Sequence, residues 1–166
     1  MRLLLDTNIY VYMVSDRKSL TKDVCKYLED PENLKYLSIV SLQELITAFR
    51  TKKLLSNIWK TEAEMISFVL NDPSVEIDNT DVNVIRTLAA LQVNEAQEHK
   101  DPFDHIIIAQ AISHKMTLVS SDTKFPFYRK HRAFQRVFTP GVGRLFLCRA
   151  VYEFKRCGRL AVYSFL

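Results

Sequence analysis

The chain has 166 residues, 48% of them hydrophobic and 25% charged, and these values fit a single domain with a sizeable core. The composition excludes a disordered chain, and no apolar run is long enough for a membrane span or a signal peptide. Three widely spaced cysteines, Cys25, Cys148 and Cys157, indicate a reduced compartment rather than a disulfide framework or a zinc site. We therefore expect a cytoplasmic protein that is not inserted in a membrane.

Charge is distributed unevenly along the chain. The net charge of +4 combines −5 over residues 1–123 with +9 over residues 124–166. Because proteins contact phosphates mainly through Lys and Arg, a basic end on an acidic body suits an anionic polymer such as RNA. On charge alone, a solvated tail without such a role is an equal alternative.

Short apolar runs alternate with amphipathic segments. Strands are predicted at RLLLD (2–6), LKYLSIV (34–40), SVEID (74–78) and MTLVSSD (116–122). Helices are predicted at about 20–30, 41–55, 61–70, 80–93 and 101–111. The inward positions would be Leu42, Leu45, Ile46 and Phe49 in the helix at 41–55, and Val82, Ile85, Leu88 and Ala89 in the helix at 80–93. This alternation predicts an α/β fold with a mainly parallel sheet.

The sequence TPGVG at 139–143 has the composition of a boundary. Residues 1–138 are therefore expected to form the domain. Residues 139–166 would form a basic, aromatic tail, whose role stays open because it has no clean helical or strand period.

Acidic residues follow the predicted strands. Asp6 ends the first strand, Glu44 begins the helix after the second, and Asp122 follows the last. In an open parallel sheet these positions share the carboxyl edge, where such folds bind ligands. Asp101 and Asp104 begin the helix that leads into the last strand, so they would lie at the opposite edge unless that helix is tilted.

Each acid also has an ordinary structural explanation. Ser41 and Glu44 have capping-box spacing, and Asp101 before Pro102 is a good helix N-cap. Asp6 and Asp122 would serve as turn residues.

The joint pattern favours a metal site. Asp104 lies one turn before Ile107 and Ile108, which places it at an interior rim. Several acids gathered there would raise one another's pKa values unless a cation held them. A set of carboxylates selects Mg²⁺ or Mn²⁺, ions that serve phosphoryl chemistry by activating water. His99 and His105 flank these acids and are expected on the helix surface.

Four motifs resemble, in order, those of PIN-domain ribonucleases, above all the VapC-type toxins of type II toxin–antitoxin systems. They are LLLDTN, SLQEL, DPFDHIIIAQA and LVSSD, and the similarity covers about residues 1–128. The resemblance implies a Rossmann-like α/β/α fold and Mg²⁺- or Mn²⁺-dependent endoribonuclease activity, commonly as a homodimer. It also implies inhibition by a small antitoxin protein that lies across the active-site groove.

The resemblance also assigns site residues. It makes Asp6, Glu44, Asp104 and Asp122 the catalytic, metal-binding acids, with Asp101 as an outer or alternative ligand. Side chains that would orient these carboxylates by hydrogen bonds are Thr7, Asn8, Ser41 and Ser121. The chain departs from the pattern at His105, where Arg is more usual, and in the tail from Gly141, which has no counterpart.

Two other functions stay open. A PIN fold could bind RNA or a protein without cutting, although the complete acid set argues against lost activity. A HAD-type phosphatase also begins with a strand that ends in Asp, but it needs a second Asp two residues later, where this chain has Asn8.

Overall fold

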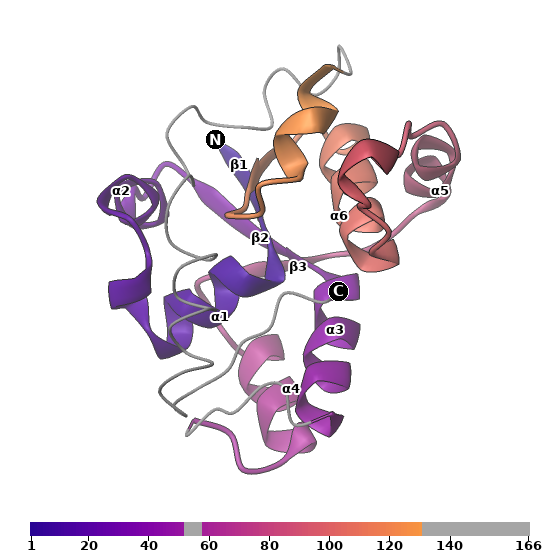
Figure 1. Cartoon of the computed structure of the whole chain (residues 1–166). Helices are drawn as coiled ribbons and strands as arrows, with labels where there is room; N and C mark the ends of the chain where they lie inside the picture. Colours follow the sequence, from indigo (N-terminus) through magenta and orange to yellow (C-terminus); the bar gives the residue numbers. More distant parts are fainter. Residues whose placement is uncertain (52–57, 131–166) are drawn as a thin grey trace.

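The computed structural model describes residues 1–51 and 58–130, and its centre is a parallel four-stranded sheet (Figure 1). The strands are β1 (Arg2–Leu5), β2 (Leu34–Ser38), β3 (Glu76–Asp78) and β4 (Thr117–Val119), in the order β3-β2-β1-β4. Every pairing is parallel, with Leu5 opposite Leu37 and Val119 in the two neighbouring strands. The predicted α/β class and mainly parallel sheet are confirmed.

Six α-helices connect and cover these strands. They are α1 (Thr7–Ser15), α2 (Lys22–Glu29), α3 (Ile39–Arg50), α4 (Glu62–Leu70), α5 (Val82–Ala89) and α6 (Pro102–Ser113). Three short 3₁₀ helices accompany them: η1 (Arg17–Ser19), η2 (Glu95–Gln97) and η3 (Phe125–Lys130). All five predicted helices are present, and α1 is an additional helix that the sequence pattern did not indicate.

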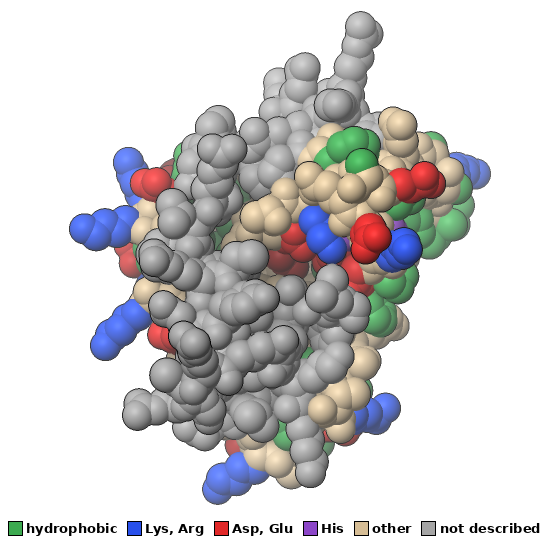
Figure 2. All heavy atoms as spheres, viewed as in Figure 1, with side chains coloured by type: hydrophobic (Ala, Val, Ile, Leu, Met, Phe, Trp, Pro, Cys, Tyr) green, Lys and Arg blue, Asp and Glu red, His purple; other side chains and the backbone are tan. Residues whose placement is uncertain are grey.

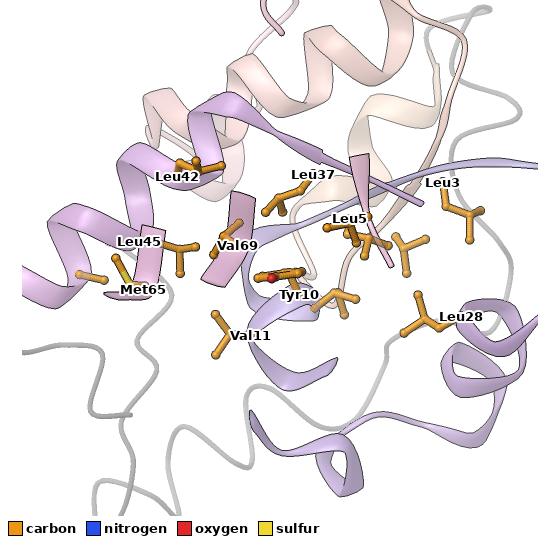
Figure 3. Close-up of a cluster of buried hydrophobic side chains, with 14 of the residues drawn as sticks. Leu3, Leu5, Tyr10, Val11, Leu28, Leu37, Leu42, Leu45, Met65 and Val69 are labelled. Carbon is orange, nitrogen blue, oxygen red and sulfur yellow. The ribbon is translucent and has the colours of Figure 1, made fainter. Parts of the chain in front are cut away.

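Side chains of β1 divide the interior into two cores, because successive residues of a strand point to opposite faces. Leu3 and Leu5 pack with residues of α1 to α4, including Tyr10, Leu45 and Met65 (Figure 3). Leu4 packs on the other face, with α6 and η3. Since helices cover both faces, the described part of the chain forms three layers, α/β/α.

Two local predictions were wrong. The second strand ends at Ser38, and Ser38 itself caps α3 by accepting a hydrogen bond from the Val40 N–H at 3.1 Å. Ser41 and Glu44 therefore lie inside α3 and do not form a capping box.

The inward face of α5 was also mispredicted. Val82, Ile85 and Ala89 are exposed, Leu88 is half-buried, and Val84 is the fully buried residue. The helix packs mainly against α6, so this neighbour selects the face that turns inward. In α3 the predicted face is confirmed, because Leu42, Leu45, Ile46 and Phe49 all contact the first core.

The predicted boundary at residue 138 and the tail at 139–166 lie outside the described residues, as do Cys148 and Cys157. Cys25 is a free thiol. Within residues 1–51 and 58–130, no helix combines the length and apolar composition that crossing a membrane requires.

Candidate metal centre

Four segments of the chain bring acidic side chains to the carboxyl edge of the sheet. Glu44, Asp101 and Asp104 each place one carboxylate oxygen within 4.8 Å of the others. Asp104 is also within that distance of Asp122 and a ring nitrogen of His99. Asp6 is close enough to Glu44 and Asp104 to raise the pKa of both. We call Asp6, Glu44, Asp101, Asp104 and Asp122 the acid cluster.

The tilt of α6 decides that Asp101 and Asp104 join this cluster. Gln110, in the last turn of α6, accepts a hydrogen bond from Ser38 at the end of β2 and donates to the Asp78 carbonyl at the end of β3. The helix therefore crosses the carboxyl edge of the sheet. The alternative placement of Asp101 and Asp104 at the opposite edge was wrong.

Asp6 follows β1 directly and is only 3% exposed. Its backbone N–H donates to the Val119 carbonyl at 3.0 Å, and its Oδ2 accepts from the Ser120 hydroxyl at 2.7 Å. Burial raises the pKa of Asp6 to about 6, although the bond from Ser120 opposes the shift. Asp6 therefore carries its negative charge at a cost in free energy.

Glu44 projects from α3 and is also only 3% exposed. Burial, followed by repulsion from Asp6, raises its pKa to about 9, although the Thr7 hydroxyl donates a hydrogen bond to its Oε2. Ser41 lies one helical turn earlier, and its buried hydroxyl has no hydrogen-bond partner within the described chain.

Asp104 lies in the first turn of α6, where the macrodipole favours a negative charge. Burial is nevertheless the largest influence and, together with repulsion from Asp6, raises its pKa to about 9. Its Oδ2 lies 2.9 Å from Nε2 of His99.

Asp101 is the N-cap of α6, as predicted, and its Oδ1 accepts from the Phe103 N–H at 2.9 Å. Asp122 sits just past β4, where its Oδ1 accepts from the Lys124 N–H at 2.7 Å. Both acids therefore have a local structural role and also lie among the other carboxylates.

Of the four side chains expected to orient the acids, Thr7 contacts a carboxylate. Ser120, and not Ser121, donates to Asp6, and Ser120 also accepts from the Asp122 N–H at 3.0 Å. The Ser121 hydroxyl is buried without a partner among the described residues. Asn8 is half-buried and makes no hydrogen bond to the acid cluster within the described chain.

His99 also lies where the sequence did not predict it. It precedes α6 and is 1% exposed, so its prediction as a helix-surface residue was wrong. No periodic signal could have found it, because it lies in a loop between η2 and α6. His105 is half-buried, with its Nε2 unpaired within the described chain.

The donor set fits a hard divalent cation. Within the described residues, no Lys or Arg forms an ion pair with Asp6, Glu44 or Asp104, although the charge of Lys124 lowers the pKa of Asp104 slightly. Figure 2 shows carboxylate atoms gathered near the centre of one face, beside basic side chains. Carboxylate oxygens without a cysteine set are the ligands that Mg²⁺ and Mn²⁺ prefer.

A family model described as the PIN domain matches residues 3–131. The chain therefore belongs to the PIN domain family, and its three-layer fold with a parallel sheet agrees with that membership.

Solved structures with the same fold include toxin–antitoxin complexes. VapBC2 from Rickettsia felis, bound to a DNA fragment from its promoter, aligns with a TM-score of 0.59 and 22% identity over 77% of this chain and 93% of that chain. VapBC-1 from nontypeable Haemophilus influenzae aligns with a TM-score of 0.56 and 18% identity over 82% and 92%. At these identities the likeness supports the fold alone. A search of curated proteins found no match.

Proposed function

We propose that this protein is a metal-dependent endoribonuclease that hydrolyses RNA phosphodiesters with an activated water. The observation that carries the proposal is the convergence of the half-buried Asp104 with the buried Asp6 and Glu44, whose pKa values are raised to about 9, 6 and 9. A site built only for stability would pair such groups with Lys or Arg. These carboxylates instead suit a divalent cation that the protein takes up.

In the proposed site, Asp6, Glu44, Asp104 and Asp122 hold Mg²⁺ or Mn²⁺, with Asp101 as an additional or alternative ligand. When bound, the ion supplies an activated water and stabilises the leaving oxygen of the phosphodiester. Ser120 fixes Asp6 and Thr7 fixes Glu44 through the hydrogen bonds described above. We retain Ser41, Ser121 and Asn8 as proposed orienting residues for the carboxylates, the role that the sequence motifs imply for them.

We further propose that the protein is a VapC-type toxin, acting in the cytoplasm as a homodimer and neutralised by a small antitoxin protein. Support comes from family membership and from the toxin–antitoxin complexes that share the fold. Copurification with the product of a small neighbouring gene, followed by loss of RNA cleavage in the complex, would test the antitoxin. Light scattering of the purified chain would test the dimer.

Replacement of single acids tests the nuclease. Asp6→Asn and Asp104→Asn should each lower Mn²⁺-stimulated RNA cleavage by at least about 100-fold, because each removes a charged ligand. Both variants should stay folded, since neither substitution changes the shape of a core residue. The matched control is Asp23→Asn, which changes an exposed acid in the first turn of α2 and should cleave like the wild type.

The measurement is the initial rate on several structured and single-stranded RNAs with Mn²⁺, Mg²⁺ and EDTA. Equal rates in the wild type and both variants, or no cleavage by any of them, would contradict the nuclease. RNA binding that survives in all variants without cleavage would instead favour a silent binding module. The HAD-type phosphatase is no longer an alternative, because the chain belongs to the PIN domain family.

A further inference from the structure

His99 occupies an enclosed position beside the acid cluster. The chain reaches it through Glu98, whose φ of 52° lies in the left-handed region, and the His99 N–H then donates to the Asn94 carbonyl at 3.2 Å. The imidazole ring packs against Phe125, His105 and Tyr128, with ring centroids 5.7, 4.8 and 5.5 Å away. These contacts fix both the position and the plane of the ring.

Both ring nitrogens of His99 have polar partners. Nε2 lies 2.9 Å from Oδ2 of Asp104, and Nδ1 lies 2.8 Å from the Tyr128 hydroxyl oxygen. That oxygen also accepts a hydrogen bond from the Asn94 N–H at 3.3 Å. A continuous chain of hydrogen bonds therefore runs from the backbone at Asn94 to a carboxylate of the acid cluster.

The direction of these bonds follows from the ionised form of Asp104. A carboxylate that holds a cation can only accept hydrogen bonds, so Nε2 of His99 must carry the proton and donate. In a neutral imidazole Nδ1 is then the acceptor, and the Tyr128 O–H donates to it. The Asn94 N–H, which donates to the Tyr128 oxygen, leaves the phenol proton free for this role.

We propose that His99 is a positioning residue for Asp104, and that Tyr128 in turn fixes the orientation and tautomer of His99. The inference rests on the proposed metal-dependent function. By donating to Oδ2, His99 stabilises the ionised carboxylate and leaves Oδ1 for the cation. Partners of this kind usually raise metal affinity 10- to 100-fold.

If the His99 ring only filled space, Mn²⁺ affinity would not depend on its hydrogen bond to Asp104. The ring fills space between Phe125 and Tyr128, which an apolar side chain could also fill, but only a donor at the place of Nε2 can orient Asp104. Leu removes that donor while keeping an apolar body, and Gln restores an N–H at a similar reach. The pair His99→Leu and His99→Gln therefore separates volume from hydrogen bonding.

The experiment measures Mn²⁺ binding directly, by the loss of the free-ion EPR signal on titration into metal-free protein. His99→Leu should weaken Mn²⁺ binding 10- to 100-fold, and His99→Gln should recover most of that loss. Tyr128→Phe keeps the ring and should weaken binding by a smaller factor, about 3- to 10-fold, because it removes only the fixed tautomer. Gln92→Leu, at an exposed position after α5, is the matched control and should bind Mn²⁺ like the wild type.

Cleavage at increasing Mn²⁺ concentration provides a second readout. Saturating Mn²⁺ should restore the rate of His99→Leu, whereas it should not restore Asp104→Asn, which lacks the ligand itself. If His99→Leu binds Mn²⁺ as tightly as the wild type, or if His99→Gln is as weak as His99→Leu, the positioning role is overturned. If His99→Leu does not fold, Tyr128→Phe tests the positioning role in its place. Wild-type affinity for Mn²⁺ in Tyr128→Phe then overturns the inference.

This experiment distinguishes the two proposals. Binding of Mn²⁺ that depends on His99, in a protein that cleaves no RNA, would overturn the nuclease and support the positioning role. RNA cleavage that requires Asp104, together with Mn²⁺ binding that does not change in the His99 variants, would support the nuclease and overturn the positioning role. A wild-type protein that binds no Mn²⁺ would overturn both.

Discussion

The acid cluster and the surroundings of Asp78 both hold poorly exposed carboxylates near the carboxyl edge of the sheet, yet their environments differ. The Asp78 carboxylate accepts hydrogen bonds from the side chains of Gln110 and His114, the latter at 2.7 Å. Gln110 in turn accepts from the Ser38 hydroxyl at 2.6 Å. We call Asp78, Gln110, His114 and Ser38 the Asp78 network. Its donors and acceptors are matched across three elements.

In the acid cluster, burial and, after it, repulsion between acids outweigh the few hydrogen bonds. After burial, neighbouring acids raise these pKa values further: Asp122 that of Asp6, and Asp6 those of Glu44 and Asp104. Each of the three has one side-chain hydrogen-bond partner within the described residues. Asp81, an exposed acid beside the Asp78 network, has its pKa lowered by the Val84 N–H and, to a lesser degree, by nearby His114. Burial of a carboxylate is therefore no sign of function by itself, and the informative feature is burial without enough donors or cations.

The largest expected effect is the pH dependence of the metal-free protein. The carboxyls of Asp6, Glu44 and Asp104 ionise at ordinary values of 3.8, 4.5 and 3.8 when unfolded, but at about 6, 9 and 9 when folded. As pH rises past 4, the unfolded chain loses these protons first, which favours unfolding. In EDTA the free energy of unfolding should therefore fall by several kcal/mol between pH 4 and pH 9.

Thermal denaturation in EDTA over this pH range, repeated with Mn²⁺, measures that effect. Mn²⁺ should restore stability most at high pH, because the ionised acids bind it. Stability that stays constant or rises between pH 5 and pH 8 in EDTA would show that the acid cluster is already compensated, which would remove its contrast with the Asp78 network.

The next effect concerns the Asp78 network. Gln110→Leu should lower the free energy of unfolding by about 1–3 kcal/mol, because the Ser38 hydroxyl and the Asp78 carboxylate both lose a buried partner. The control Gln43→Leu, at an exposed position of α3, should change it by less than about 0.5 kcal/mol. Urea denaturation of both variants measures the difference. Equal stability of the two would mean that the network does not hold α6 to the sheet.

The smallest expected effect is a gain in the free energy of unfolding. Glu44→Gln should raise the stability of the metal-free protein at pH 8 by roughly 1 kcal/mol, because Glu44, with its pKa raised from 4.5 to about 9, must take up a proton on folding at that pH, whereas the amide is always neutral. The same variant should lose Mn²⁺-dependent stabilisation. Glu76→Gln, an exposed position of β3, is the control. Destabilisation of Glu44→Gln in EDTA would place Glu44 with the structural carboxylates.

The sequence by itself determined the alternation of strands and helices, since each predicted short run contains a parallel strand, and the most apolar ones, β1 and β4, are largely buried. It also determined the N-cap at Asp101, because Asp before Pro is a local signal. Helix α1 escaped prediction because TNIYVYMVS is apolar around most of its circumference and has no clear period. Apolar residues on several faces of α5 likewise left its inward side undecided until α6 selected Val84.

The candidate metal centre depended on tertiary structure to a greater degree. The motif order indicated Asp6, Glu44, Asp104 and Asp122, but only the tilt of α6, held by Gln110, brings Asp104 to the edge where β1 ends. The chain path after β4 decided that Ser120, rather than Ser121, meets Asp6. The folding of residues 94–99 back onto Tyr128 decided that His99 is buried beside Asp104. These outcomes depend on angles and contacts between distant segments, which local sequence signals do not encode.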